Sequence, residues 1–314
     1  MSDPPIHNVF VVINPASGQD RPILSIMNRA FSAGGVNWDV GLTKRSGDAL
    51  RMAREAVLAG ADAVAVYGGD GTLNEVASGL SGSGVPLAIF PGGTANVMSI
   101  ELGIPGDLEQ AIGLVCNHTH QIRTIDMGRV HGSLASDQMF LLRLSVGYFA
   151  RMTEGTARES KNRMGVLAYA FSALSALPQA EMVHFQIEID GDLVEAEGVT
   201  CVIANSGAMG MPGLTFSRQV SVDDGLLDVV VMRNADLLEV AKVLGNALGG
   251  VENLPHWQGR QITLHADPPQ PIECDGEMIE ATPVMVSIVP QALRVIVPGS
   301  MTVEALTQEI LNQE

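Results

Sequence analysis

The chain has few cysteines and few basic residues for its length. Only three cysteines occur among 314 residues, at positions 116, 201 and 274. This odd and widely spaced set excludes a disulfide framework and a Cys-x-x-Cys metal site, so we expect a cytoplasmic protein. The 18 basic residues stand against 35 acidic ones, for a formal net charge of −17, which argues against nucleic acid and against permanent attachment to an anionic membrane. Any bound phosphate must then be held by backbone amides and metal ions.

Long apolar runs and a leader segment are also missing. The longest uncharged apolar stretch, Met164 to Leu177, has 14 residues, whereas a membrane-spanning helix needs about 20. The first residues, Met1 to Pro5, have neither the basic nor the apolar region of a signal peptide. We therefore expect a soluble protein that visits a membrane surface only peripherally.

Aromatic residues are scarce at 4%, but 46% of the residues are hydrophobic and 34 are glycines, which is typical of globular α/β proteins. The length suits two domains. In the first 127 residues, an apolar strand, a polar or glycine-rich turn and a helix recur, with strands expected over 9–13, 38–42, 61–66 and 85–90. This alternation predicts a parallel sheet wrapped by helices.

After residue 127 the pattern changes to β-rich segments joined by hairpin signals, Asp190-Gly191 and Asp275-Gly276. Strands are expected over 140–146, 184–189, 199–204, 226–232, 262–266, 284–289 and 293–297, and helices over 164–177, 236–248 and 303–312. The predicted domains are residues 1–127, with 298–314 returning to them, and residues 128–297. The first is an α/β domain and the second is antiparallel and mostly β.

Three glycine-bearing turns, at 14–18, 68–72 and 92–94, each follow a strand of the predicted parallel sheet. They should therefore meet at its carboxyl edge, where ligands bind. In the second turn, glycines surround Asp70 at the start of a helix, a place suited to an anion. A carboxylate there would repel phosphate unless a divalent cation or a proton transfer lies between, so the turn indicates a nucleotide with Mg²⁺.

Two common nucleotide motifs are absent. The chain has no Gly-x-x-x-x-Gly-Lys-Ser/Thr sequence, and Asn74 stands where Gly-x-Gly-x-x-Gly needs its last glycine. These differences exclude a Walker-type ATPase and a Rossmann-type dehydrogenase.

The motifs resemble those of the diacylglycerol kinase catalytic superfamily, which includes sphingosine and ceramide kinases and bacterial lipid kinases. The resemblance rests on Asn14-Pro-Ala-Ser-Gly, Gly68-Gly-Asp-Gly-Thr-Leu-Asn-Glu and Pro91-Gly-Gly-Thr-Ala-Asn, and continues through residues 223–228 and 274–277. It implies an NAD-kinase-like α/β nucleotide domain followed by an antiparallel β-sandwich domain for the lipid. It also implies transfer of the γ-phosphoryl group of ATP to a lipid hydroxyl, with diacylglycerol as the default acceptor.

The resemblance assigns roles to individual residues. Glu277 would be the general base, in the same turn as Asp275, and Asp70 would act through Mg²⁺. On the residues alone, Asp-Gly-Glu is a β-turn with a solvated acid and Asp70 is a turn former. The ATP contacts would be Asn14, Pro15, Ser17, Gly18, Thr43, Gly68, Gly69, Asp70, Gly71, Thr72, Gly93, Thr94 and Asn96.

A structural Mg²⁺ is implied at Asp224 with the main-chain carbonyls of Ser221 and Leu226, since oxygen ligands suit this ion. The alternative is an Asp-Gly turn that begins a strand. Arg158, Lys161 and Arg163 precede the apolar segment 164–177 and suggest contact with lipid headgroups. The alternative there is a solvated loop before a core helix.

The third motif departs from many bacterial lipid kinases, because Val97 to Ile100 lack their acid and arginine. Sphingoid bases, undecaprenol-like alcohols and other glycerolipids therefore stay open as acceptors, as does a homodimer. NAD kinase shares the Gly-Gly-Asp-Gly-Thr turn but accounts less well for residues 14–18. A non-catalytic lipid-binding relative is the third alternative, against which Asp70 and Glu277 argue. A kinase requires these two carboxylates to converge across the domains.

Overall fold

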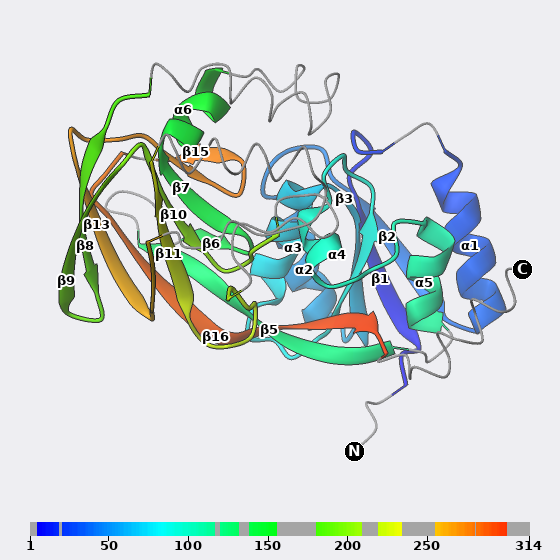
Figure 1. Cartoon of the computed structure of the whole chain (residues 1–314). Helices are drawn as coiled ribbons and strands as arrows, with labels where there is room; N and C mark the ends of the chain where they lie inside the picture. The colour runs from blue at the N-terminus through cyan, green and yellow to red at the C-terminus, as the bar shows by residue number, and fades with distance from the viewer. Residues whose placement is uncertain are drawn as a thin grey trace, which may run out of the picture.

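A computed structural model describes residues 5–18, 21–116, 120–131, 138–155, 180–208, 219–233, 255–279 and 281–299 of the chain (Figure 1). These residues form two sheets with helices around part of the first. The elements of the N-terminal part are β1 (Asn8–Ile13), α1 (Ile23–Gly34), β2 (Asn37–Leu42), α2 (Asp48–Leu58), β3 (Ala63–Gly68), α3 (Asp70–Leu80), β4 (Leu87–Pro91), α4 (Val97–Glu101) and α5 (Leu108–Cys116).

The remaining elements are β5 (His120–His131), β6 (Gln138–Phe140), β7 (Arg143–Gly147), α6 (Tyr148–Gly155), β8 (Val183–Ile189), β9 (Asp192–Gly198), β10 (Thr200–Ala204), β11 (Leu227–Met232), β12 (His256–Gly259), β13 (Gln261–Asp267), β14 (Ile272–Cys274), β15 (Glu277–Ile279) and β16 (Val284–Pro298). The predicted helices over 164–177, 236–248 and 303–312 lie outside the described residues.

The N-terminal strands form the predicted parallel arrangement. β1 pairs in parallel with β2 and β3, and β3 pairs in parallel with β4. Every residue of β3 is buried, because helices cover both faces: α1 and α5 pack together on one, α2 and α3 on the other (Figure 1). Apolar strands that are buried on both faces are typical of parallel sheets.

Two long strands connect this parallel part with the rest of the molecule. β5 and β16 pair antiparallel along most of their length, with an irregularity between Val289 and Leu293. One end of β16 pairs with β4, and the other pairs with β13. The first sheet therefore continues from β2 to β9 through β16, and the predicted boundaries at residues 127 and 297 both fall within this ribbon (Figure 1).

The second sheet is antiparallel, in the order β12-β11-β10-β7-β14-β15. Buried side chains from this sheet, such as Ile203 and Val229, share one core with Phe185 and Leu264 of the first sheet. Two sheets that face each other across such a core form a sandwich. The predicted fold class, an α/β part followed by a β-sandwich, is confirmed.

Both predicted two-residue hairpins are present. Asp190 and Gly191 join β8 to β9, and Asp275 and Gly276 join β14 to β15. All four residues have positive φ, of 51°, 96°, 46° and 89°. Two consecutive positive φ values define the type I′ turn, which suits the twist of a hairpin.

Two strand predictions were wrong in detail. The segment Phe140 to Val146 is not one strand, because the backbone bends between β6 and β7. At the bend, the Asp275 carboxylate accepts hydrogen bonds from the N–H groups of Leu141 and Leu142. The segments 284–289 and 293–297 are not separate, because β5 pairs with both and makes them one strand, β16.

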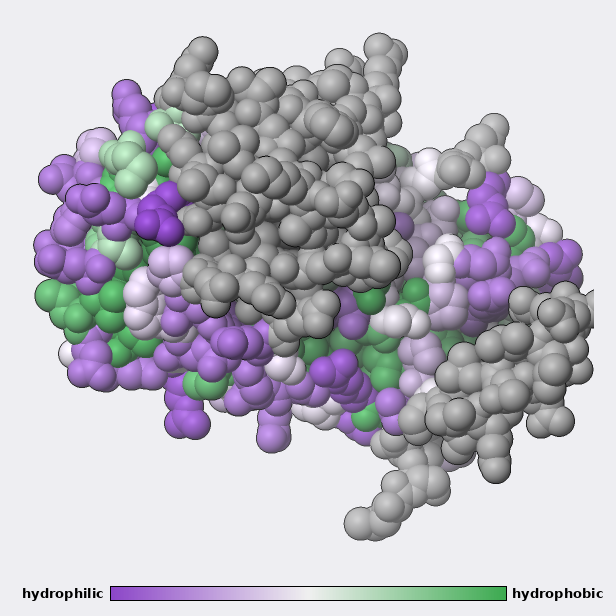
Figure 2. Space-filling model, viewed as in Figure 1, coloured by the Kyte–Doolittle hydropathy of each residue, from purple (hydrophilic) through white to green (hydrophobic). Residues whose placement is uncertain are grey.

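No helix among the described residues is long and apolar enough to span a membrane. On the face seen in Figure 2, polar side chains cover much of the described surface, with smaller apolar areas between them.

Candidate active site between the two sheets

The three glycine-bearing loops meet at the carboxyl ends of β1, β3 and β4, as predicted. The N–H group of Asn14 donates to the carbonyl of Tyr67 at 3.0 Å, and that of Gly92 donates to the carbonyl of Gly68 at 3.0 Å. In addition, Asn14 Nδ2 donates to Thr72 Oγ1 at 2.9 Å. The second loop is thus bonded directly to both of its neighbours.

Glycine is required where these loops touch. Gly18 has a φ of 92°, and a Cβ atom there would lie 2.4 Å from Tyr67 Oη. A Cβ atom on Gly93 would lie 2.6 Å from the Cα atom of Gly69. A side chain at position 93 would push the second and third loops apart, and one at position 18 would collide with the Tyr67 ring and strain the backbone.

Asp70 begins α3 and links the second loop to the third. Its Oδ1 accepts a hydrogen bond from the Val97 N–H group at 2.8 Å, at the first turn of α4. Burial raises the pKa of Asp70, while the N–H groups of Val97 and Met98 and the charge of Arg143 oppose the rise. The carboxylate therefore lies in a site where a nearby positive charge stabilises its ionised form.

The other predicted nucleotide contacts have different surroundings. Thr94 is exposed at the tip of the third loop. Asn96, at a φ of 47°, closes that loop, since its side chain exchanges two hydrogen bonds of 2.9 Å with the backbone of Gly93. Thr43 follows β2, and its N–H group donates to the carbonyl of Ile13 at 2.9 Å. Thr43 and Thr94 thus lie at the same edge of the sheet as the loops.

Glu75, to which the sequence analysis gave no role, organises the neighbouring helix end. Its carboxylate accepts the N–H groups of Gly47 and Ala49 at 3.0 and 3.1 Å and the Ser46 hydroxyl at 3.2 Å. A carboxylate at a helix N-terminus satisfies free N–H groups and the helix dipole. Glu75 thereby holds the start of α2 against α3.

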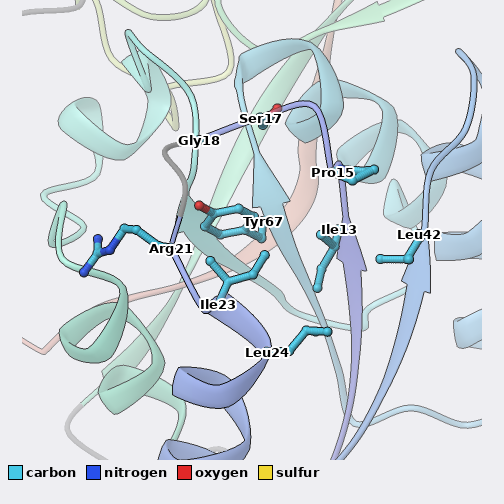
Figure 3. A pocket seen from close by; sticks show the side chains of 9 residues that line it. All are labelled: Ile13, Pro15, Ser17, Gly18, Arg21, Ile23, Leu24, Leu42 and Tyr67. Atoms are coloured by element: carbon cyan, nitrogen blue, oxygen red, sulfur yellow. The ribbon is translucent and has the colours of Figure 1, made fainter.

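A small pocket adjoins the first loop on the side of α1 (Figure 3). Its volume is about 380 Å³. It is lined by Ile13, Pro15, Ser17, Gly18, Arg21, Ile23, Leu24, Leu42 and Tyr67. Figure 3 shows the aliphatic side chains and the Tyr67 ring gathered around it, with Arg21 directed away from them.

On the second sheet, Asp275 holds the strand β7 in place. Its carboxylate accepts the backbone N–H groups of Leu141, Leu142 and Arg143 at 2.8, 3.1 and 2.9 Å. Burial raises the pKa of Asp275 to about 6, although these three N–H groups act to lower it. The Asp275 carboxylate is thus fully used in hydrogen bonds to the backbone of residues 141–143, which suits a role in positioning the hairpin rather than in chemistry.

Glu277 follows Gly276, the second residue of the turn, and is exposed to solvent. It begins β15 and pairs in register with Cys274. The Glu273 carboxylate accepts the N–H group of Gly276, which adds to the constraint on the hairpin. Glu277 therefore stands on a fixed turn with its side chain accessible.

Arg143 connects the two halves of the site. Its backbone is bonded to Asp275 of the hairpin, and its positive charge acts on Asp70 of the second loop. The chain offers one signal of this role that the sequence analysis did not use: Arg143 is the only charge in the apolar run from Phe140 to Val146.

The predicted magnesium turn precedes β11. Asp224 Oδ1 accepts the Leu226 N–H group at 3.0 Å, and Ser221 Oγ donates to Asp223 at 2.7 Å. Desolvation raises the pKa of Asp224, and the charges of Asp126 and Asp223 raise it further. Such crowded carboxylates fit a divalent cation, which would relieve their repulsion. Among the described residues, no group of three or more His, Cys, Asp or Glu side chains is arranged to hold a metal ion, so this site would depend on main-chain oxygens.

The predicted lipid-contact residues Arg158, Lys161 and Arg163 lie outside the described residues. Their contribution stays a prediction.

Both parts of the chain match known families. Residues 8–130 match the diacylglycerol kinase catalytic domain, and residues 143–297 match the YegS C-terminal NAD kinase β-sandwich-like domain. A crystal structure of a diacylglycerol kinase from Bacillus anthracis is similar, with a TM-score of 0.78 at 26% identity, over 94% of this chain and 98% of that one.

Relatives in other bacteria extend the similarity. A Pseudomonas aeruginosa protein named "probable lipid kinase YegS-like" is 33% identical over 267 residues, 83% of this chain and 84% of that protein. Bacillus subtilis diacylglycerol kinase is 28% identical over 277 residues, 85% of this chain and 88% of the other. An uncharacterized Synechocystis protein is 35% identical over 239 residues, 74% of this chain, but the match spans only 54% of that longer protein.

Proposed function

The chain belongs to the diacylglycerol kinase catalytic family of lipid kinases, and we propose that it transfers the γ-phosphoryl group of ATP to a lipid hydroxyl group with Mg²⁺ as cofactor. The observation that carries the proposal is the convergence at Arg143. This residue is bonded to the hairpin of Asp275 and Glu277, and its charge acts on Asp70 in the nucleotide loops.

The nucleotide would bind at the three loops. The backbones of Gly69 and Gly93 approach so closely that no side chain fits between them, and N–H groups at the start of α3 can meet phosphate oxygens. The adjoining Asn14, Thr72 and Thr94 offer side-chain partners. This arrangement suits a chain whose net charge is −17, since it needs few cations to bind an anion.

Glu277 would act as the general base. It accepts the proton of the lipid hydroxyl while the hydroxyl oxygen forms a bond to the γ-phosphorus atom, and the bond from that phosphorus to the β–γ bridging oxygen breaks to release ADP. A positioned base contributes about 10²- to 10⁴-fold. Asp275 positions the base, because its carboxylate fixes the turn to β7.

Asp224, with the carbonyls of Ser221 and Leu226, would hold a structural Mg²⁺, and Asp70 would act through a Mg²⁺ at the phosphates. An ion held there would supply positive charge to the transferred phosphate. The chain's own contribution is to fix Asp70 against the first turn of α4.

The acceptor we propose is diacylglycerol or a similar glycerolipid. Relatives named diacylglycerol kinase support this choice. Arg158, Lys161 and Arg163 would contact the headgroups at the membrane surface, while the rest of the acidic chain stays in solution.

The test is incubation of the purified protein with γ-labelled ATP, Mg²⁺ and vesicles of phosphatidylcholine that contain diacylglycerol, beside a parallel reaction with NAD. We expect label in phosphatidic acid and a loss of at least about 100-fold in the Glu277→Gln variant. Label in NADP would favour NAD kinase, and no labelled product from either acceptor or from a mixed lipid extract would favour a non-catalytic relative.

A further inference from the structure

We propose that Arg143 is a catalytic residue whose guanidinium group contacts the transferred phosphoryl group. The inference rests on the proposed function and deepens it. It identifies a residue of the second sheet whose positive charge would offset the carboxylates around the transferred phosphoryl group.

The backbone of Arg143 is held firmly. It begins β7, its Cα atom is in register with that of Ala204 on β10, and its N–H group donates to Asp275 at 2.9 Å. The hairpin that carries Glu277 is thus fixed to the same residue that carries the guanidinium group. A shift of one would move the other.

The side chain is held by a chain of contacts that begins in the first part of the molecule. Arg143 Nη1 donates to the carbonyl of Ala208 at 2.9 Å. The N–H group of Ala208 donates to the Glu101 carboxylate at 3.0 Å, as does the Ser206 hydroxyl at 2.7 Å. Glu101 is the last residue of α4, the helix whose first turn is capped by Asp70. The start of α4 is therefore bonded to Asp70, and its end is linked to Arg143 through Ala208.

The guanidinium group retains binding capacity. It has five N–H donors, and among the described residues only the Ala208 carbonyl takes one. Its charge opposes the effect of burial, which raises the pKa of Asp70. Its other donors make no hydrogen bond to a described residue and could bind an anion that lies between the hairpin and α4.

The phosphoryl group is the reactant whose negative charge these donors would bind. The hairpin and the second loop otherwise supply the carboxylates of Asp70, Glu273, Asp275 and Glu277, which repel an anion. In the transition state charge spreads over the three equatorial phosphoryl oxygens while the bond to ADP breaks and the bond to the lipid oxygen forms. The planar fork of arginine can bind two of these oxygens together, which a lysine cannot.

The experiment compares the purified wild type with Arg143→Gln, Arg143→Lys and Arg143→Ala in the labelled-ATP assay, with ADP binding measured by calorimetry and folding by thermal melting. We expect Arg143→Gln to lose about 10²- to 10³-fold in kcat, with ADP affinity and Tm close to those of the wild type. Arg143→Lys should also lose most activity although it keeps the charge. Added guanidinium chloride at millimolar concentration should restore part of kcat in Arg143→Ala. The control is Arg51→Gln, an exposed arginine on α2 that pairs with Glu55, which should behave like the wild type.

Two outcomes overturn the inference. If kcat of Arg143→Gln stays within about threefold of the wild type, Arg143 does not contact the reacting group. If all Arg143 variants lose ADP affinity and thermal stability together, and guanidinium restores nothing, the residue is structural. Failure of the proposed function is separate, because the wild type itself would then label no lipid.

Discussion

At the scale of single residues, the site depends on glycines placed where backbones touch. The close approach of Gly93 to Gly69 joins the second and third loops. The spacing of glycines after strands predicts this meeting, because parallel strands bring their carboxyl ends to one edge. No such rule predicts Arg143. Its charge acts on Asp70, and no local pattern in the sequence relates two residues that lie so far apart along the chain.

Substitution of Gly93 by alanine should weaken nucleotide binding. The new Cβ atom would lie 2.6 Å from the Cα atom of Gly69, so the two loops must separate. We expect ADP affinity, measured by calorimetry, to fall at least about tenfold, or about 1.4 kcal/mol. The matched control is Gly106→Ala, where a Cβ atom meets nothing within 4 Å. Equal affinity in the two variants would contradict the prediction.

At the scale of elements, Asp126 joins three parts of the backbone. It lies within β5, and only 2% of it is exposed. Its Oδ2 accepts the N–H group of Gly225 in the turn before β11, and its Oδ1 accepts the N–H group of Gln291 in the irregular part of β16, both at 2.7 Å. The composition of β5 and β16 predicts strands but not this junction, because nothing local marks an aspartate whose partners lie 99 and 165 residues away.

Asp126→Ala should therefore destabilise the protein. It leaves two N–H groups without their carboxylate partner in a buried position, at a cost of about 3 kcal/mol in the free energy of unfolding. Urea unfolding followed by circular dichroism measures this change. Asp192→Ala, an exposed aspartate at the start of β9, should change the stability by less than about 0.5 kcal/mol. A similar small effect at Asp126 would show that water replaces the lost carboxylate.

At the scale of the whole molecule, stability should depend on pH through carboxylates that act in opposite directions. Backbone or arginine partners lower the pKa of Asp48, Asp62 and Asp223, so these groups stabilise the fold as pH rises. Burial raises the pKa of Asp275 to about 6. Its ordinary value is about 3.9. Its protonated form therefore contributes stability that is fully present below about pH 4 and is lost as pH rises through about 6.

The Asp275→Asn variant isolates this effect, because the other carboxylates are common to both proteins. The free energy of unfolding of the wild type, relative to that of the variant, should fall by up to about 3 kcal/mol between pH 4 and pH 7. Urea titrations at several pH values measure the difference. A difference that does not change with pH would show that Asp275 titrates near its ordinary value in the folded protein.

The paired strands β5 and β16 determine how the two parts of the molecule can move relative to each other. In many two-part enzymes a flexible linker lets one lobe swing as a rigid body. Here the connection is a continuous ribbon of hydrogen bonds that belongs to both parts, interrupted only between Val289 and Leu293. Any change in the angle between the parts must bend or twist that ribbon, and the irregular stretch is its softest point. The relative positions of the two parts are therefore set by the paired strands rather than by a free hinge.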